Sequence, residues 1–424
     1  MKTLFKNIIF YQKIKKIFFP FYKSKDIKNL FKILEKDKPK NTQVAMFVGG
    51  CVRKFLNNET IDDIDIATIF SPEEVKEKFK NSNFKIIDTG IEHGSITAII
   101  NSNKFEITTL RQDIKTDGRH AEVSFTDDWK QDSNRRDFTI NAIYMDRRGR
   151  IYDPQDGIKD LKKNEINFIG DSSTRIEEDY LRIIRYIRFC IQYNINQPDP
   201  KIINAIKLNL NGIKNLSKER ILSELYKIFK LKNINILLKN EEIKNIFLLI
   251  FPEFKYLERL KKYIFLQDPE LIFSILLVDE KDNYQYFCHK YNVSNKLKNY
   301  LSFIAKNYIQ FKEEKNFLKK ELKKNIYNYG KKNIKSLIKF IYCVETKFST
   351  KMKDNLLNEV NKIEIPSFPY NGQFLKEKGF IEGKEIGFVL KELEKEWLEK
   401  DFNLKRTEVA SIVNKIKKSS VLNV

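Results

Sequence analysis

The chain has 424 residues, with 79 Lys and Arg against 57 Asp and Glu, so its net charge at pH 7 is +22. This excess favours a polyanionic partner such as a nucleic acid, although a biased Lys-rich composition would explain it equally well. A hydrophobic fraction of 42% excludes global disorder and is enough for about two to four domains. The four cysteines are far apart and form no CxxC pair, which argues against a disulfide framework and a zinc site.

The N-terminal segment is basic and aromatic. Lysines interrupt its apolar run over residues 1–24, and no small-residue cleavage site follows. This pattern argues against a secretory signal peptide and leaves an organelle presequence open. No stretch of the chain reaches the ~18 apolar residues of a membrane span. We therefore predict a cytoplasmic protein without a membrane partner, beginning with a basic helical extension over residues 1–40.

The next part of the chain alternates short apolar runs with turn residues, which is typical of strands. The runs are VAMFV, DIDIATIF, FKIID, SITAII, KFEITTL, NAIYMD and RIYD. Residues 51–56 and 71–79 suit helices instead. We predict an α+β domain, a mixed sheet with helices, over residues 41–170.

Beyond Ser173 the pattern changes to helical periodicity, with apolar residues every three or four positions, as in Ile176 to Phe189. We predict an all-helical remainder. Proline and glycine return between Pro366 and Gly387, which marks a joint before a last helical segment around residues 390–398. The predicted helical parts are residues 171–230, 231–360 and 361–424.

The most informative acidic residues are Asp63 and Asp65, which flank one isoleucine in an apolar run. In a strand, residues i and i+2 point to one face, so the two carboxylates would lie side by side. An oxygen-ligated Mg²⁺ ion would relieve their repulsion. Glu106, inside KFEITTL, would complete the three-carboxylate cluster of a two-metal phosphoryl-transfer site. The alternatives are a strand with two exposed acids and an outward-facing Glu106.

A glycine pair, Gly49-Gly50, ends one predicted strand and opens a helix. Backbone N–H groups at such a helix start can hold phosphates. Arg53 follows one turn later, where it could pair with a triphosphate. The alternative is an ordinary tight turn. The pattern GxxxxGK[ST] is absent from the chain, which excludes a P-loop.

Two denser clusters follow. Residues 135–142 combine two arginines with Asp137 and Asn141, or else form a helix start capped by Asp137. In residues 178–185, Asp179 and Arg182 stand at i and i+3 on a predicted helix, where a salt bridge is the ordinary explanation.

The Asp179 and Arg182 pair also suits base recognition. Cytosine and adenine present an amino donor beside a ring-nitrogen acceptor, whereas uracil and guanine present a carbonyl beside an N–H. A carboxylate beside a guanidinium would accept C and A, and each mismatched buried group would cost roughly 1–3 kcal/mol. Such a protein could select bases without a nucleic-acid template.

Taken together, these segments resemble the class II tRNA nucleotidyltransferase family, the CCA-adding enzymes, and by kinship the bacterial poly(A) polymerases. The ordered matches span residues 47–225. They are FVGGCVR, DIDIAT, TGIEHGSITAII, FEITTLRQD, TDGRHAEVSFTDDW, RRDFTINAIY, YDPQDGIKDL, RIEEDYLRIIRYIRF and LSKERILSEL. Residues 379–397 are similar to a tail segment of the same family.

The resemblance implies a polymerase-β-like nucleotidyltransferase head followed by a helical neck, body and tail. It implies catalytic Mg²⁺ on Asp63 and Asp65 with Glu106 as the nearby third acid. It further implies a set of nucleotide-binding residues, namely Gly49, Gly50, Arg53, Arg136, Asp137, Asn141, Asp179, Arg182 and Arg185. Thr116 to Val123 resembles the flexible loop associated with switching from C to A. Where the family often carries Asp after GGxVR, this chain has Lys54, and Asn57-Asn58 replaces an expected glycine.

The activity implied by the resemblance is template-independent addition of C, C and A to the 3′ end of tRNA, from CTP and ATP, with release of pyrophosphate by two-metal catalysis. The alternatives are a poly(A) polymerase, a partial enzyme that adds CC or A, and an inactive RNA-binding relative. The lysine-rich helical remainder would hold tRNA by phosphate contacts. The sequence leaves the contacting lysines and the oligomeric state open.

Overall fold

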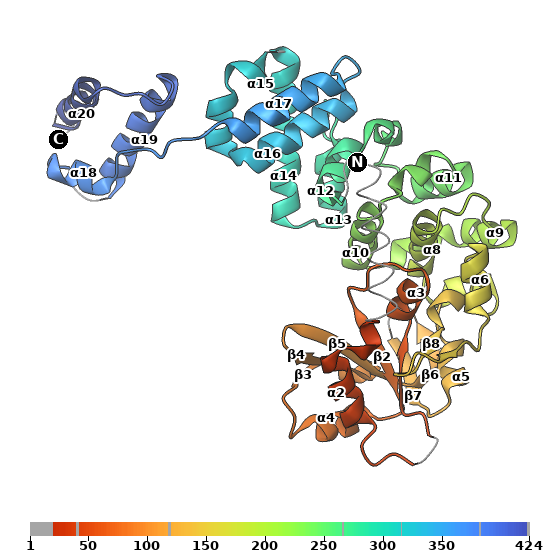
Figure 1. Cartoon of the computed structure of the whole chain (residues 1–424). Helices are drawn as coiled ribbons and strands as arrows, with labels where there is room; N and C mark the ends of the chain where they lie inside the picture. Colours follow the sequence, from red (N-terminus) through yellow and green to blue (C-terminus); the bar gives the residue numbers. More distant parts are fainter. Residues whose placement is uncertain are drawn as a thin grey trace, which may run out of the picture. The chain divides into compact units, whose positions relative to one another are not determined.

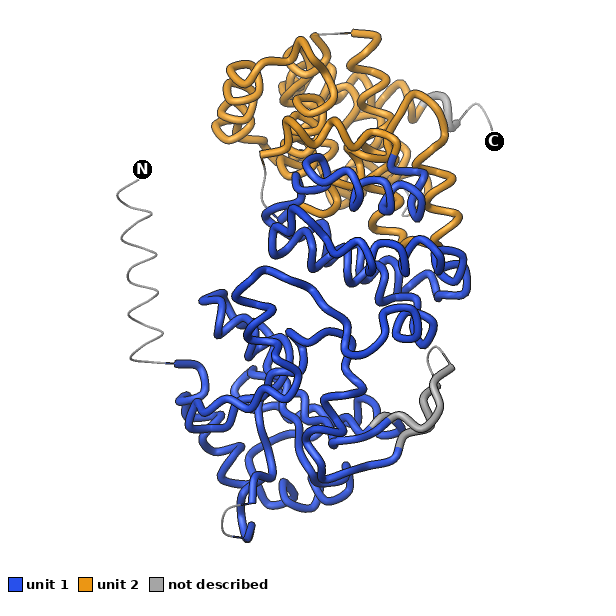
Figure 2. Tube along the Cα trace, turned by 90° about the vertical axis from the view of Figure 1, so that its right-hand side faces the viewer, with its two compact units in different colours: residues 1–254, 265–267 blue, residues 255–264, 268–424 orange. Residues whose placement is uncertain are grey.

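The computed structural model describes residues 20–39, 42–117, 120–264, 267–314, 316–380 and 383–421. The chain divides into two compact units, Met1–Phe254 with Phe265–Gln267, and Lys255–Ile264 with Asp268–Val424 (Figure 2). The first part of the predicted N-terminal extension, residues 1–19, lies outside the described residues. No helix in the described ranges is long and apolar enough to span a bilayer.

A seven-stranded sheet with the order β3-β4-β5-β2-β1-β8-β9 forms the centre of the first unit. The β2–β5 pair is parallel and the other pairs of this sheet are antiparallel, so the sheet is mixed as predicted. Its strands coincide with the seven apolar runs of the sequence. They are β1 (Ala45–Val48), β2 (Ile64–Thr68), β3 (Lys85–Gly90), β4 (Ser95–Ile100), β5 (Asn103–Thr109), β8 (Tyr144–Met145) and β9 (Ile151–Tyr152).

Helices α2 (Lys25–Leu34) and α4 (Pro72–Phe79) lie side by side against this sheet (Figure 1). The apolar face of α2 is buried, and its Phe31 ring lies 4.8 Å from the ring of Phe47 in β1. The described end of the N-terminal segment therefore belongs to the core of the head. Helices α3 (Gly50–Leu56) and α4 confirm the two helices predicted for the head.

A second, two-stranded sheet pairs β6 (Arg111–Asp117) with β7 (His120–Phe125). The flexible loop expected over residues 116–123 falls on the turn of this pair, where the described backbone on both sides forms an antiparallel hairpin. Residues 118–119 lie outside the described residues, so the flexibility of the loop remains a prediction. Strand β6 is hard to predict because Ile114 is its only apolar residue, so it lacks the alternating pattern of a half-buried strand. Helix α5 (Trp129–Asn134) and the short helix η3 (Thr139–Asn141) follow.

Helix α6 (Gly157–Lys163) still belongs to the range predicted for the head. The later helices of the first unit confirm the change to helical structure predicted beyond Ser173. They are α7 (Ser172–Glu178), α8 (Leu181–Gln192), α9 (Pro200–Asn209), η4 (Leu210–Asn215), α10 (Lys218–Phe229), η5 (Ile234–Leu238) and α11 (Glu241–Ile250).

The periodic segment from Ile176 to Phe189 is not one helix. Asp179 adopts an extended conformation, with φ −156° and ψ 100°, and ends α7 before α8 begins. Its carboxylate accepts a hydrogen bond from the backbone N–H of Leu181, a local bond that competes with helix continuation. The expectation that Asp179 and Arg182 share the face of one continuous helix is therefore wrong.

The second unit is helical throughout its described residues. Its helices are η6 (Leu257–Lys262), α12 (Pro269–Leu277), α13 (Asn283–Tyr291), α14 (Asn295–Glu313), α15 (Phe317–Lys320), α16 (Leu322–Val344), α17 (Thr350–Lys362), α18 (Gly372–Glu377), α19 (Lys384–Glu399) and α20 (Arg406–Val421). Gly330, with φ +79°, kinks α16. The last three helices share a hydrophobic cluster that includes Trp397. Helix α19 contains the predicted segment 390–398. The domain boundaries drawn from the sequence remain predictions.

Candidate active site

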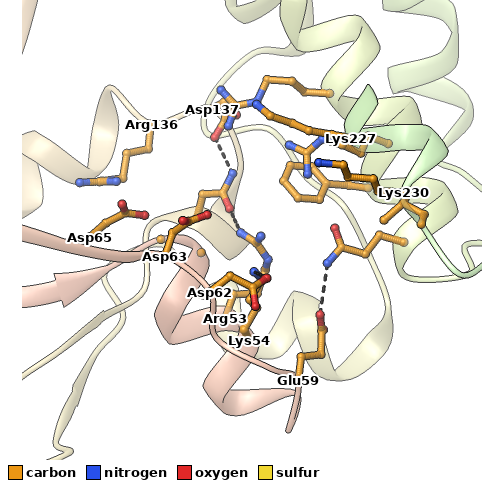
Figure 3. A pocket seen from close by; sticks show the side chains of 18 of the residues that line it. Arg53, Lys54, Glu59, Asp62, Asp63, Asp65, Arg136, Asp137, Lys227 and Lys230 are labelled. Atoms are coloured by element: carbon orange, nitrogen blue, oxygen red, sulfur yellow. Dashed lines mark hydrogen bonds and ion pairs between the residues drawn. The ribbon is translucent and has the colours of Figure 1, made fainter. Parts of the chain in front are cut away.

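A cavity of about 1590 Å³ lies within the first unit. Its walls come from the head and from helices α7, α8 and α10 (Figure 3). Eleven of the twelve predicted site residues line this cavity. They are Gly49, Gly50, Arg53, Asp63, Asp65, Arg136, Asp137, Asn141, Asp179, Arg182 and Arg185. The twelfth, Glu106, is exposed and is not part of the lining.

Asp63 and Asp65 lie at the start of β2 and face the cavity. Neither side chain has a hydrogen-bond or ion-pair partner among the described residues. Burial, and then the nearby charges of Glu106 and Asp63, raise the pKa of Asp65 to about 6. Glu106 stands beside Asp65 because strands β2 and β5 pair these two residues in register. The charges of Arg136 and Arg53 act in the opposite direction but only partly offset this negative charge.

This pair of carboxylates fits a divalent cation. Carboxylate oxygens are the ligands that hard cations such as Mg²⁺ prefer, and a cation would offset the repulsion felt by Asp65. The described residues contain no group of three His, Cys, Asp or Glu side chains close enough to hold one metal ion. The structure thus supplies two carboxylate ligands, and the three-carboxylate cluster stays a prediction.

Gly49 opens helix α3 beside these carboxylates. Its φ is +70°, a conformation that favours glycine. A Cβ atom at Gly49 would lie 3.9 Å from the Asp65 carboxylate and 3.9 Å from the Arg136 guanidinium. The predicted strand-to-helix turn is confirmed, and it leaves the backbone open to the cavity.

Arg53, one turn into α3, is only 5% exposed. Its guanidinium donates hydrogen bonds to the Tyr193 hydroxyl, at 2.6 Å from Nε, and to the Asn141 side chain. It also lies 4.9 Å from the centre of the Phe189 ring. Helix α8 therefore holds the arginine of α3. Tyr193 was not predicted, because a tyrosine near a helix end belongs to no recognisable motif.

Arg136 is held by a buried acid that the sequence analysis also missed. Asp132 of α5 accepts hydrogen bonds from Arg136 Nη2 at 2.9 Å and from the Tyr144 hydroxyl at 2.7 Å, and it pairs with Arg135 at 2.7 Å. Burial acts to raise the pKa of Asp132, but the guanidiniums of Arg136 and Arg135 hold it well below its usual range. The signal in the sequence was an acid three and four residues before two arginines.

Asp137 joins the head to α8. Its carboxylate accepts hydrogen bonds from the Asn141 amide at 2.8 Å and from the Phe138 backbone N–H at 2.9 Å. The Arg185 guanidinium lies 2.8 Å away. Burial opposes ionisation, but Arg185 and the hydrogen bonds lower the pKa of Asp137. These contacts go beyond a helix cap and fix one edge of the cavity.

Asp179 and Arg182 do not form the salt bridge that was the ordinary explanation for their spacing. Asp179 pairs with Arg220 of α10 at 2.7 Å, and Arg182 pairs with Glu178 at 2.5 Å. Arg182 also donates to the backbone carbonyl of Arg175. Both side chains line the cavity, each held by a different partner.

The two departures from the family pattern have structural explanations. Lys54 forms an ion pair with Asp62 at 2.9 Å, so it ties helix α3 to the segment that leads into Asp63. Asn58 has φ +56°, a left-handed conformation that asparagine tolerates better than most other non-glycine residues. The paired carboxylates are unaffected by either change.

A mixed sheet that carries two carboxylates without partners among the described residues, beside a glycine turn and a set of anchored arginines, suits a nucleotidyltransferase. Residues 45–167 match the family described as the poly A polymerase head domain. The chain is 32% identical over 395 residues to CCA tRNA nucleotidyltransferase 1, mitochondrial, of Danio rerio, with 88% of each chain covered. It is 43% identical over 189 residues to the CCA-adding enzyme of Lactobacillus delbrueckii subsp. bulgaricus, covering 43% of this chain and 46% of that one.

The fold agrees with this relationship. The crystal structure of the Bacillus stearothermophilus CCA-adding enzyme in complex with CTP has a TM-score of 0.72 to this chain, at 21% identity, and covers 95% of this chain and 100% of that one. The chain belongs to the CCA tRNA nucleotidyltransferase family. Enzymes of this nucleotidyltransferase class use divalent metal ions.

Proposed function

We propose that this chain adds C, C and A in turn to the 3′ end of tRNA, using CTP and ATP and releasing pyrophosphate. The observation that carries the proposal is the pair Asp63 and Asp65, unpartnered among the described residues, in a cavity whose lining also contains seven arginines. Identity of 32% over 88% of the chain to a CCA tRNA nucleotidyltransferase supports it.

Asp63 and Asp65 would hold the divalent cation, for which we propose Mg²⁺. When bound, the cation would supply positive charge that lowers the pKa of the attacking tRNA hydroxyl and offsets charge on the leaving pyrophosphate. Glu106 would act on Asp65 through its charge, from the neighbouring strand.

The triphosphate would lie against Gly49, Gly50, Arg53 and Arg136. Burial of Arg53, and its bonds to Tyr193 and Asn141, orient the guanidinium before a nucleotide arrives, which reduces the ordering cost of binding. Asp132 does the same for Arg136. Asp137 and Asn141, linked to each other and to Arg185, would contact the ribose and phosphates.

Asp179 and Arg182 would pair with the incoming base. Arg220 and Glu178 hold their charged ends at 2.7 and 2.5 Å, which supports two fixed hydrogen-bonding groups. A carboxylate acceptor beside a guanidinium donor suits cytosine and adenine and leaves uracil and guanine mispaired. The protein would select both nucleotides without a template.

The test uses tRNA transcripts that end without CCA, with C and with CC, plus an unrelated RNA, each with CTP, ATP or both and Mg²⁺. We expect the tRNAs to gain three, two and one nucleotides and then stop, and the unrelated RNA to remain unchanged. Long A tails on any RNA would identify a poly(A) polymerase, and arrest after CC a partial enzyme. No extension of any RNA would contradict the proposal.

We keep the prediction of a cytoplasmic protein as part of this proposal. The relatives include mitochondrial proteins as well as bacterial ones. A fluorescent reporter fused behind residues 1–40 would remain in the cytoplasm if the prediction is right and would enter an organelle if it is wrong.

A further inference from the structure

The basic side chains that line the cavity fall into two groups. The arginines and Lys54 have polar partners within the chain, and Arg188 and Lys227 share the carboxylate of Glu224 at 2.7 and 2.8 Å. Lys230 and Lys232 differ. Both are exposed, both line the cavity, and neither ammonium has a hydrogen-bond or ion-pair partner in the part of the chain that the structure describes. The charges of these two ammonium groups are therefore unpaired among the described residues.

The two lysines lie where α10 ends. Lys230 is the C-cap of the helix, and a cation there also complements the helix dipole. That explanation does not extend to Lys232, which follows the helix and still lines the cavity. Figure 3 shows Lys227 and Lys230 on the other side of the cavity from Asp65 and Arg136. Lys230 therefore lies across the cavity from Arg136, one of the residues proposed to hold the triphosphate.

The cavity has room for more than one ligand. Its volume of about 1590 Å³ exceeds the ~300–1,000 Å³ of a site for a single small molecule. A polynucleotide whose 3′ hydroxyl reaches Asp63 and Asp65 must leave the cavity past another wall, with one negative charge for each nucleotide. Free ammonium groups suit such phosphates because they contact the backbone without reading the base.

We propose that Lys230 and Lys232 bind backbone phosphates of the single-stranded 3′ end of the tRNA. The proposal rests on the proposed function, whose partner it places on a named wall of the cavity. The proposal assigns different roles to two groups of cations. The arginines, which are held by partners within the chain, would bind the nucleotide. The two lysines would bind the RNA strand, which moves after each addition.

The test compares K230A/K232A with wild type on a tRNA ending in CC, with ATP as the second substrate. We expect the KM for tRNA to rise about tenfold at 0.15 M salt and the KM for ATP to change less than twofold. The slope of log affinity against log salt should fall by about 1.4, since each phosphate contact on a single strand contributes about 0.7.

The matched control is K201A/K239A, which removes the same charge from two exposed lysines of the same unit outside the cavity. K230R/K232R should restore the KM for tRNA because it keeps both charges. Equal KM values for tRNA in K230A/K232A and the control would overturn the proposal, as would an equal rise in the KM for ATP.

The dissociation constant for tRNA, measured in parallel by gel shift, needs no catalysis. If the wild type is active and K230A/K232A binds tRNA as tightly as the wild type does, the proposed phosphate contacts are wrong and the CCA-adding function is not affected. An inactive wild type contradicts the CCA-adding function, while the gel shift still decides whether the two lysines bind RNA.

Discussion

Two acidic regions of the head illustrate opposite uses of a carboxylate. At the start of β2, Asp65 has no partner among the described residues, and burial with neighbouring acids raises its pKa to about 6. In α5, Asp132 is fully buried but contacts two guanidiniums and a tyrosine hydroxyl, and its pKa is lowered. Arg136 links the two regions, because it pairs with Asp132 and its charge also acts on Asp65. An unpaired acid therefore indicates a site for a ligand, whereas an acid surrounded by arginines indicates a residue that positions those arginines.

The largest effect is expected for D65N, which keeps the shape of the side chain and removes its charge. We expect kcat/KM for nucleotide addition to fall about a thousandfold or more, because several kcal/mol of charge stabilisation are lost and each 1.4 kcal/mol is about tenfold. The unfolding free energy should not fall and should rise somewhat, since no partner among the described residues is removed and the unfavourable burial and repulsion of the charge are relieved. Single-turnover assays and denaturant unfolding measure the two quantities, and D63N is the companion variant. Full activity in either variant would contradict their role.

D132N makes the same chemical change in the other region and should affect stability first. It leaves the half-buried guanidiniums of Arg135 and Arg136 without their shared counter-charge, so we expect the unfolding free energy to fall by about 3 kcal/mol. A larger loss of stability in D65N than in D132N would reverse the comparison.

The pH dependence sharpens this second prediction. Because the folded-state pKa of Asp132 is depressed, its contribution is present above the unfolded pKa of about 4 and is lost as the pH falls through the lower folded value. The difference in unfolding free energy between wild type and D132N should therefore stay constant from about pH 8 to pH 5 and shrink below pH 4. A difference that persists unchanged into strong acid would show that the ionised pair is not its source.

The sequence predicted the region of Asp65 better than that of Asp132. Short apolar runs between turn residues marked the strands, and the DxD spacing predicted a common face for Asp63 and Asp65, since both are local properties of the chain. Asp132 had a local signal in its spacing to Arg135 and Arg136. The partners of other site residues come from elsewhere in the fold, as with Tyr193 for Arg53 and Arg220 for Asp179. No local spacing specifies such tertiary contacts. The helix break at Asp179 was missed because the helical periodicity of the sequence continues through it.

The next largest effect is expected for G212A, which would disturb the helix break at Asp179. A Cβ atom at Gly212 would lie 2.0 Å from the Tyr180 ring, next to Asp179. G212A should displace Tyr180, cost about 1–3 kcal/mol of stability by overpacking, and weaken discrimination against UTP and GTP. Nucleotide competition assays and thermal unfolding check both outcomes. The matched control is G387A, because a Cβ atom there meets open space in helix α19. Unchanged stability and selectivity in G212A would show that the Tyr180 contact does not hold the break.

The smallest effect is expected for Y193F, which removes one acceptor from Arg53 and keeps the ring. Asn141 and Phe189 still contact the guanidinium, so the arginine stays in the cavity with more freedom. Losing a hydrogen bond to a charged group costs about 1.5 kcal/mol, so the KM values for CTP and ATP should each rise about tenfold while their ratio and kcat hold. An altered ratio would assign Tyr193 to base selection, and a fall in kcat alone would assign it to chemistry. A parallel rise in both KM values identifies a residue that positions the arginine on which both triphosphates depend.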